Sequence, residues 1–141
     1  MAVGAFAFVA SGRSVTVLTV REPGNAASFV LPELLELLPE LATSEWGVTG
    51  LECTGDAADA MYAIEERRQR LTGEELLALA RRLLQVIDGE FDGLRGGAEW
   101  VTLRVIDGSD FDVETRDEVV VARVRARFTQ VEDVTAHFRP R

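Results

Sequence analysis

The segment WVTLRVIDGSDFDVET, residues 100–115, decides the fold class of this chain. Apolar and polar residues alternate over residues 100–106 and again over residues 110–115, which is typical of strands that bury one face. The dipeptide Asp107-Gly108 between the two runs has the chemistry of a tight turn. The segment therefore predicts two antiparallel strands, with one face in a core and the other face in water.

Further strands are expected on both sides of this segment. Gly96-Gly97 lies between two strand-like runs, as a two-residue hairpin turn would. At the N-terminus, residues 3–9 and 14–20 are two more apolar runs, joined by Ala-Ser-Gly-Arg, and they predict a hairpin. A secretory signal is the competing interpretation, but no basic residue precedes the apolar run, since the first is Arg13.

Helical patterns occupy the middle of the chain and part of its end. Leucines recur at helical spacing over residues 28–41, where Pro39 must end or kink the helix. Residues 56–70 form a second helical pattern. A capping-box spacing, Thr72-x-x-Glu75, opens a third helix over residues 73–87. For residues 116–128 the sequence leaves helix and strand open, because a second capping box competes with a run rich in valine.

These elements together predict an α+β domain. We expect a mostly antiparallel sheet, made of the N-terminal hairpin and a C-terminal meander, packed with three to four helices. Residues 131–138 are the expected last strand. A chain of 141 residues without a linker-like tract fits one globular domain, residues 1–141.

The composition narrows the range of partners. The chain has 15 basic residues, all of them Arg, and 24 acidic residues, for a net charge of −9. Phosphate backbones and anionic lipid surfaces are bound by clustered cations, so we expect neither a nucleic-acid partner nor a membrane. A single Cys cannot form an internal disulfide, which favours a reducing compartment and therefore a cytoplasmic location.

Residues for catalysis or metal binding are few. Cys53 and His137 are each the sole residue of their type, and one Cys with one His cannot make a zinc site. The absence of Lys excludes a P-loop. The sequence therefore predicts no catalytic, cofactor-binding or metal-ligating residue. It favours a protein that is not an enzyme, without excluding one, and it predicts that Cys53 is structural.

Carboxylates are concentrated in residues 107–118, DGSDFDVETRDE. Asp107 belongs to the turn, and Asp117 and Glu118 fall at the start of the next predicted helix. The other three line the wet face of a strand. We predict that these three, with two acids of a nearby predicted strand, form a binding surface for a basic protein: Asp110, Asp112, Glu114, Glu90 and Asp92. The alternative is that they keep an edge strand soluble and unpaired.

One dense basic cluster accompanies these acids, and it comprises Arg67, Arg68, Arg70, Arg81 and Arg82. These arginines either pair with the excess acid inside the fold or hold an anionic group. The sequence favours the first role, because Glu65 and Glu66 directly precede Arg67 and Arg68.

Three functions fit these observations. The leading hypothesis is a small acidic, cytoplasmic, non-enzymatic protein-binding domain that neutralises or regulates a basic partner. In general type alone, by composition and without a motif, such a chain resembles bacterial immunity proteins against toxins. The second hypothesis is a small enzyme or ligand-binding domain with carboxylates and Arg around a pocket. The third is a structural subunit of a homo-oligomer that is joined through an apolar helix over residues 31–41.

Overall fold

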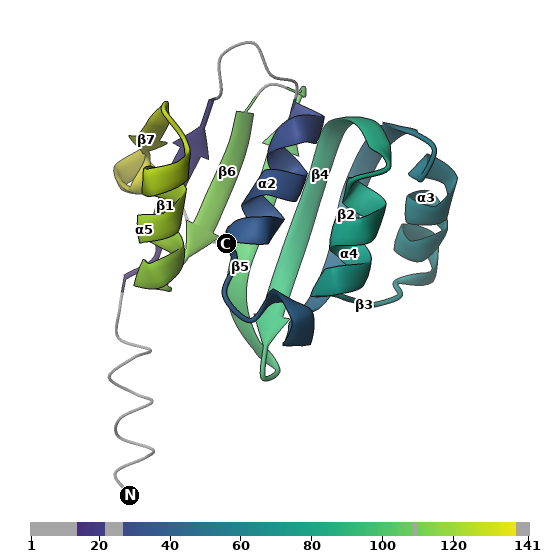
Figure 1. Ribbon diagram of the computed structural model, residues 1–141, viewed down its shortest axis with the longest axis horizontal. Helices are drawn as coiled ribbons and strands as arrows, with labels where there is room; N and C mark the ends of the chain where they lie inside the picture. The colour runs from purple at the N-terminus through teal and green to yellow at the C-terminus, as the bar shows by residue number, and fades with distance from the viewer. Residues whose placement is uncertain (1–13, 22–26, 109, 138–141) are drawn as a thin grey trace, which may run out of the picture.

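The computed structural model describes residues 14–21, 27–108 and 110–137. Within them, seven antiparallel strands form one sheet in the order β3-β2-β4-β5-β6-β1-β7 (Figure 1). The strands are β1 (Thr16–Val20), β2 (Glu45–Gly55), β3 (Leu71–Thr72), β4 (Leu83–Arg95), β5 (Ala98–Ile106), β6 (Asp110–Thr115) and β7 (Val131–Asp133). The consecutive strands β4, β5 and β6 lie side by side, as the short turns between them require.

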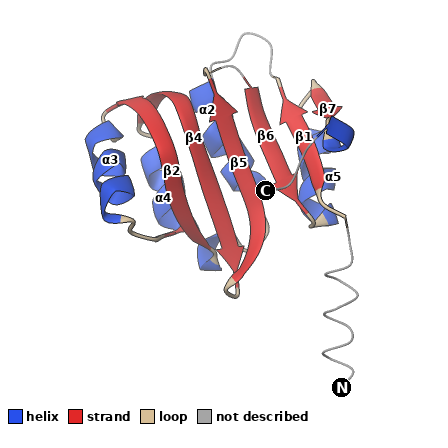
Figure 2. Ribbon diagram, turned by 180° about the vertical axis from the view of Figure 1, so that it is seen from behind, coloured by secondary structure: helices blue, strands red, loops and turns tan. Residues whose placement is uncertain are grey.

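In the described residues four α-helices pack with this sheet, so the chain has the predicted α+β fold. They are α2 (Ala27–Leu37), α3 (Ala58–Arg67), α4 (Gly73–Ala80) and α5 (Glu118–Arg127), with two short 3-10 helices, η1 (Leu41–Thr43) and η2 (Thr135–His137). The two opposite views show α2, α4 and α5 over one face of the sheet, and α3 beside β2 at one end (Figures 1 and 2).

The alternation predicted for residues 100–115 is confirmed. Leu103 and Val105 of β5 are buried, as are Phe111 and Val113 of β6, and the residues between them are partly exposed. Leu103 lies opposite Val113, so the buried residues of the two strands share one face of the sheet. That face is the one that the helices cover.

The third predicted helix is wrong over its second half. Its capping box is present, because the Glu75 N–H donates to Thr72 Oγ1 at 3.1 Å and the Thr72 N–H donates to Glu75 Oε1 at 2.9 Å. The helix ends at Ala80, however, and residues 83–87 begin β4. These residues pair with the far end of β2, so their backbone groups are satisfied by a segment about thirty residues earlier in the chain. The hydrophobic periodicity within residues 83–87 does not indicate whether a distant strand will pair with them.

Other boundaries differ less. The helix predicted over residues 28–41 ends at Leu37, two residues before Pro39. Leu31, Leu34, Leu35 and Leu38 are buried, and Leu37 and Leu41 pack against them partly exposed, so most of the apolar surface proposed for a homo-oligomer belongs to the core. Residues 118–127 are helical, with the Asp117 carboxylate accepting the N–H of Val119. The segment before α3 is the eleven-residue strand β2. The expected last strand is shortened to β7.

The core between sheet and helices is centred on large side chains. Trp46 of β2 and Phe91 of β4 are both fully buried. The indole N–H of Trp46 donates to Ser44 Oγ at 2.8 Å, which satisfies the one polar atom of that side chain. Gly93 lies opposite Trp46 in the sheet, and a Cβ added there would lie 2.7 Å from ring carbons of Trp46. The ring therefore occupies the space that a larger residue at position 93 would need.

Helix α3 covers the outer edge of β2 beyond the short pairing with β3. The Cys53 N–H donates to the hydroxyl of Tyr62 at 2.9 Å, and that hydroxyl donates to the Cys53 carbonyl at 3.2 Å. The Leu51 N–H donates to the Glu65 carboxylate at 2.9 Å. Side chains of α3 thus take the place of a neighbouring strand along this part of β2.

The strand predicted over residues 3–9 lies outside the described residues. Its expected partner is present as β1, which is paired on its two sides with β6 and β7. None of the described helices combines the length and the apolar character that crossing a membrane would require.

Candidate functional site

The sheet face opposite the helices carries the predicted acids. No described helix covers this face, which is turned toward the viewer in Figure 2. Its side chains include six carboxylates and two arginines that strand register and hydrogen bonds place together: Glu90, Asp92, Asp110, Asp112, Glu114, Glu132, Arg21 and Arg104. We call this set the acidic face. It includes all five predicted binding residues, although β5 separates the two on β4 from the three on β6.

Arg104 of β5 lies at the centre of the acidic face and joins its two halves. Its Nε donates to Glu90 Oε1 of β4 at 2.9 Å, and its Nη2 donates to Glu114 Oε1 of β6 at 2.6 Å. The Arg104 side chain is 18% exposed. Burial opposes its charge, but the hydrogen bonds that Arg104 donates to Glu114 and Glu90 raise the pKa of Arg104 overall. The pair of carboxylates is therefore held in a fixed geometry by one cation.

Arg21 has a similar role at the other end of the acidic face. Its Nε donates to Asp110 Oδ2 at 3.0 Å, and its Nη1 donates to Glu132 Oε1 at 2.7 Å. Thr19 Oγ1 donates to Asp112 Oδ1 at 2.8 Å. The acids are thus members of a hydrogen-bonded network, and the six carboxylates still outnumber the two arginines.

Asp92 is the acid whose protonation differs most from its ordinary behaviour. It accepts a hydrogen bond from Thr102 Oγ1 at 2.9 Å. Burial raises the pKa of Asp92 to about 6, and neighbouring Glu90 adds to the rise, while the Thr102 hydrogen bond and Arg104 act in the opposite direction. Perturbed carboxyl groups of this kind are enriched at functional sites.

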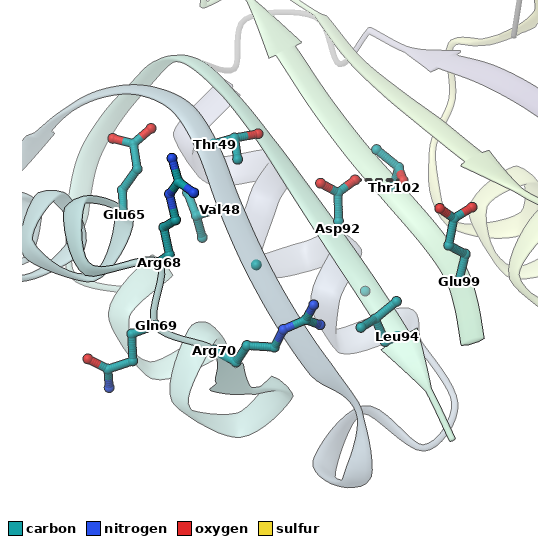
Figure 3. A pocket seen from close by; sticks show the side chains of 12 residues that line it. Val48, Thr49, Glu65, Arg68, Gln69, Arg70, Asp92, Leu94, Glu99 and Thr102 are labelled. Atoms are coloured by element: carbon teal, nitrogen blue, oxygen red, sulfur yellow. Dashed lines mark hydrogen bonds between the residues drawn. The ribbon is translucent and has the colours of Figure 1, made fainter. Parts of the chain in front are cut away.

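A groove of about 640 Å³ lies beside Asp92 (Figure 3). Its floor is formed by β2 and β4, one wall by the end of α3 and the residues after it, and the other wall by β5. Its lining residues are Gly47, Val48, Thr49, Glu65, Arg68, Gln69, Arg70, Asp92, Gly93, Leu94, Glu99 and Thr102. Groove and acidic face meet at Asp92, which belongs to both.

Two arginines of the predicted basic cluster point into this groove. Figure 3 shows the Arg70 side chain reaching across β2 and the Arg68 side chain at the outer edge of β2, beside Glu65, with Asp92 and Glu99 on the far side of the groove. Neither guanidinium has an ion-pair partner in the described part of the chain.

The expected pairing within the basic cluster is largely wrong. Arg67 and Arg68 form no ion pair with Glu65 or Glu66 among the described residues, and one Glu65 carboxylate oxygen accepts the Leu51 N–H instead. Arg81, in contrast, pairs with Glu36 of α2.

Cys53 and His137 are not brought together. Cys53 is on β2 and His137 is in η2, which packs beside β1, and three strands separate β2 from β1 in the sheet. Cys53 is 4% exposed, and burial raises the pKa of its thiol, as a structural cysteine requires. In the described residues, no three His, Cys, Asp or Glu side chains are grouped so that they could hold a metal ion.

Sequence reasoning missed the cations of the acidic face and the shape of the groove. The alternation of β5 already placed Thr102 and Arg104 on the wet face, which was the available signal for Arg104. The sequence did not indicate that Glu132 and Arg21 would lie on the acidic face, because their positions depend on the pairing of β1 with both β6 and β7. The width of the groove is set by how far α3 lies from β5 across the sheet, which is a tertiary distance that the sequence does not show.

No protein-family model, curated protein or solved structure matches the chain. The surface itself offers two chemical capacities. The acidic face can receive cationic side chains, and the groove presents unpaired guanidinium groups across from carboxylates.

Proposed function

We propose that this protein is a non-enzymatic binding domain that takes up a basic protein on the acidic face. The observation that carries the proposal is the acidic face, a connected set in which six carboxylates accompany two arginines on the uncovered side of β4, β5, β6, β1 and β7. Such an excess of one charge attracts a partner of the opposite charge and speeds its encounter. The single, buried Cys53 fits a location in the reducing cytoplasm.

The network among these acids supports recognition in addition to attraction. Arg104 and Arg21 fix the carboxylates on rigid strands, so the binding surface is ordered before the partner arrives. A surface that is already ordered loses less conformational entropy on binding. The remaining carboxylate oxygens can accept hydrogen bonds from Arg or Lys of the partner.

The alternative role, protection of a strand edge, has less support. β6 carries three of the acids and lies between β5 and β1, and β4 lies between β2 and β5. Both are interior strands, whose backbone groups are already paired on both sides. Charges on them cannot serve to block the pairing of a free edge.

The test compares two triple variants that remove equal charge. The face variant is Asp110→Asn, Asp112→Asn, Glu114→Gln, and the control is Asp59→Asn, Glu66→Gln, Glu74→Gln, at exposed positions of α3 and α4. Association with a fluorescent arginine-rich peptide is followed by stopped-flow at low salt and at ~0.15 M, where the screening length is about 8 Å.

We expect the face variant to associate roughly five- to tenfold more slowly than the wild type at low salt, and the control to change by less than about twofold. The difference should shrink at the higher salt concentration. Equal slowing in both variants, with both still folded by circular dichroism, would show that net charge alone attracts the peptide and would refute the acidic face as the binding surface.

A further inference from the structure

The two walls of the groove beside Asp92 differ in charge. Arg68 and Arg70, at the end of α3 and just after it, give one wall two guanidinium groups, against the single Glu65 carboxylate, which accepts the Leu51 N–H (Figure 3). Asp92 and Glu99 contribute the anionic side, from β4 and β5. Because the two guanidinium groups have no ion-pair partner among the described residues, their donors are available to a ligand.

The groove has the size of a small-molecule site. Its volume of about 640 Å³ lies within the range of roughly 300–1,000 Å³ that is common for ligand pockets. Gly47 forms part of the floor, directly opposite Asp92 in the β2–β4 pairing. A Cβ added to Gly47 would meet no heavy atom within 4 Å. The floor is therefore open at this point because position 47 has no side chain.

The wall of the groove at the end of α3 also has an unusual backbone conformation at Arg68. Arg68 ends α3 in the left-handed region, with φ of 53°. Its N–H and that of Gln69 bond back to the last turn, to Glu65 and Ile64 carbonyls. Glycine is the residue that this helix ending ordinarily favours, since it has no Cβ to strain. The chain instead has a residue whose side chain lines the groove, and local strain of this kind is commonly found at binding sites.

From this arrangement we propose that the groove is a binding site for a small zwitterion that has a carboxylate at one end and an ammonium group at the other. The carboxylate accepts hydrogen bonds from the Arg68 and Arg70 guanidinium groups, which match it in shape and charge. The ammonium group donates to Asp92 and Glu99. Thr102, bonded to Asp92 Oδ1, fixes the orientation of that carboxyl group. This proposal does not rest on a protein partner for the acidic face.

The first experiment measures binding to the full chain by calorimetry. The probes are three ω-amino acids of increasing length, β-alanine, γ-aminobutyrate and ε-aminohexanoate. Hexanoate and hexylamine are the controls, each with one of the two charged groups. We expect at least one zwitterion to bind about tenfold tighter than either control, because each charged end adds its own charge-assisted hydrogen bonds. If no zwitterion exceeds both controls, the proposal is refuted.

The second experiment uses variants that alter the groove and leave the fold intact. Gly47→Val fills the floor with a residue that strands favour. Arg68→Gly removes one guanidinium and relieves the left-handed strain, so it should raise the melting temperature. Arg67→Gln is the matched control, because Arg67 is an exposed arginine of the same helix that does not line the groove.

We expect Gly47→Val and Arg68→Gly each to weaken binding of the best zwitterion by about tenfold or more, and Arg67→Gln to stay within about twofold. Both groove variants should melt at or above the wild-type temperature, which separates lost binding from lost structure. Unchanged binding in both groove variants would place the ligand elsewhere and would overturn the proposal.

Discussion

The two faces of β4 show two different ways to specify a surface from one strand. Phe91 and Gly93 face the helices, where Phe91 is fully buried and Gly93 accommodates the ring of Trp46. Glu90 and Asp92 alternate with them and face outward, where each has a hydrogen-bond partner on β5. The covered face is determined by shape and volume, whereas the open face is determined by charge and hydrogen bonding. Substitutions on the two faces should therefore fail for different physical reasons.

The largest expected effect comes from the same substitution made on each face. Gly93→Ala places a Cβ 2.7 Å from the buried Trp46 ring and should lower the free energy of unfolding by about 2–3 kcal/mol, as overpacked cores do. Gly47→Ala, one strand away on the open face, meets nothing within 4 Å and should raise it by about 0.5–1 kcal/mol, because glycine weakens a strand.

Urea unfolding of both glycine variants provides the measurement. Their ΔΔG values should have opposite signs, with similar m-values if the unfolded state is unchanged. A Gly93→Ala variant as stable as the wild type would mean that Trp46 can shift away from position 93, and the contrast between a close-packed face and an open face would be lost.

A smaller effect is expected on removing the cation at the centre of the acidic face. Arg104→Leu leaves Glu90 and Glu114 without their shared partner. We expect a loss of about 1–2 kcal/mol of stability, less than for a fully buried pair because both carboxylates keep contact with water. The matched control is Arg82→Leu, at an exposed arginine outside the network. Thermal unfolding in low and high salt would distinguish them, and equal losses would remove the network as a source of stability.

The smallest effect concerns the charge on Asp92. Its pKa in the folded chain is about 6, above the ordinary value of 3.8, so the folded state holds the proton more tightly than the unfolded state. Ionisation of Asp92 therefore costs stability as pH rises from about 4 to about 6, and the full cost remains above pH 6. Since solvent partly screens the group, Asp92→Asn should gain less than about 1 kcal/mol at pH 7 and nothing at pH 4.

Denaturant titrations of Asp92→Asn and wild type at several pH values check this prediction. Glu90 and Arg104 are the charged groups that act on the Asp92 pKa, and the other charged residues that line its groove are Glu65, Arg68, Arg70 and Glu99. Asp92→Asn keeps the oxygen that accepts from Thr102, so the comparison isolates the charge. A stability difference that does not vary with pH would show that the pKa of Asp92 is not raised in the folded chain.

Local signals in the sequence were sufficient for the strands of residues 100–115 and for the capping box at Thr72. They failed for residues 83–87, where leucines at helical spacing belong to a strand that is paired with β2. Strand pairing is a contact between distant parts of the chain, and neither propensity nor periodicity encodes its register. Helix and strand patterns of a few residues overlap, so tertiary pairing decided the outcome here.

The candidate site was predictable to a different degree on each side of Asp92. All five predicted acids lie on one face, because alternation alone determines which side of a strand each residue takes. Their role in binding stays a prediction. The position of Arg68 and Arg70 across the groove could not be read from the sequence, since it requires α3 to pack at the edge of β2 and its last residues to turn back over the sheet.

The hydroxyl of Tyr62 has a consequence for how these molecules behave at high concentration. A free strand edge recruits other chains, which add as further strands and lead to fibres or amorphous aggregates. At Cys53, both the N–H and the carbonyl are occupied by one phenolic oxygen, and Glu65 occupies the Leu51 N–H. An incoming chain finds no open ladder along this stretch of β2. Addition of a further strand along this stretch of β2 is thus blocked by two side chains of a helix.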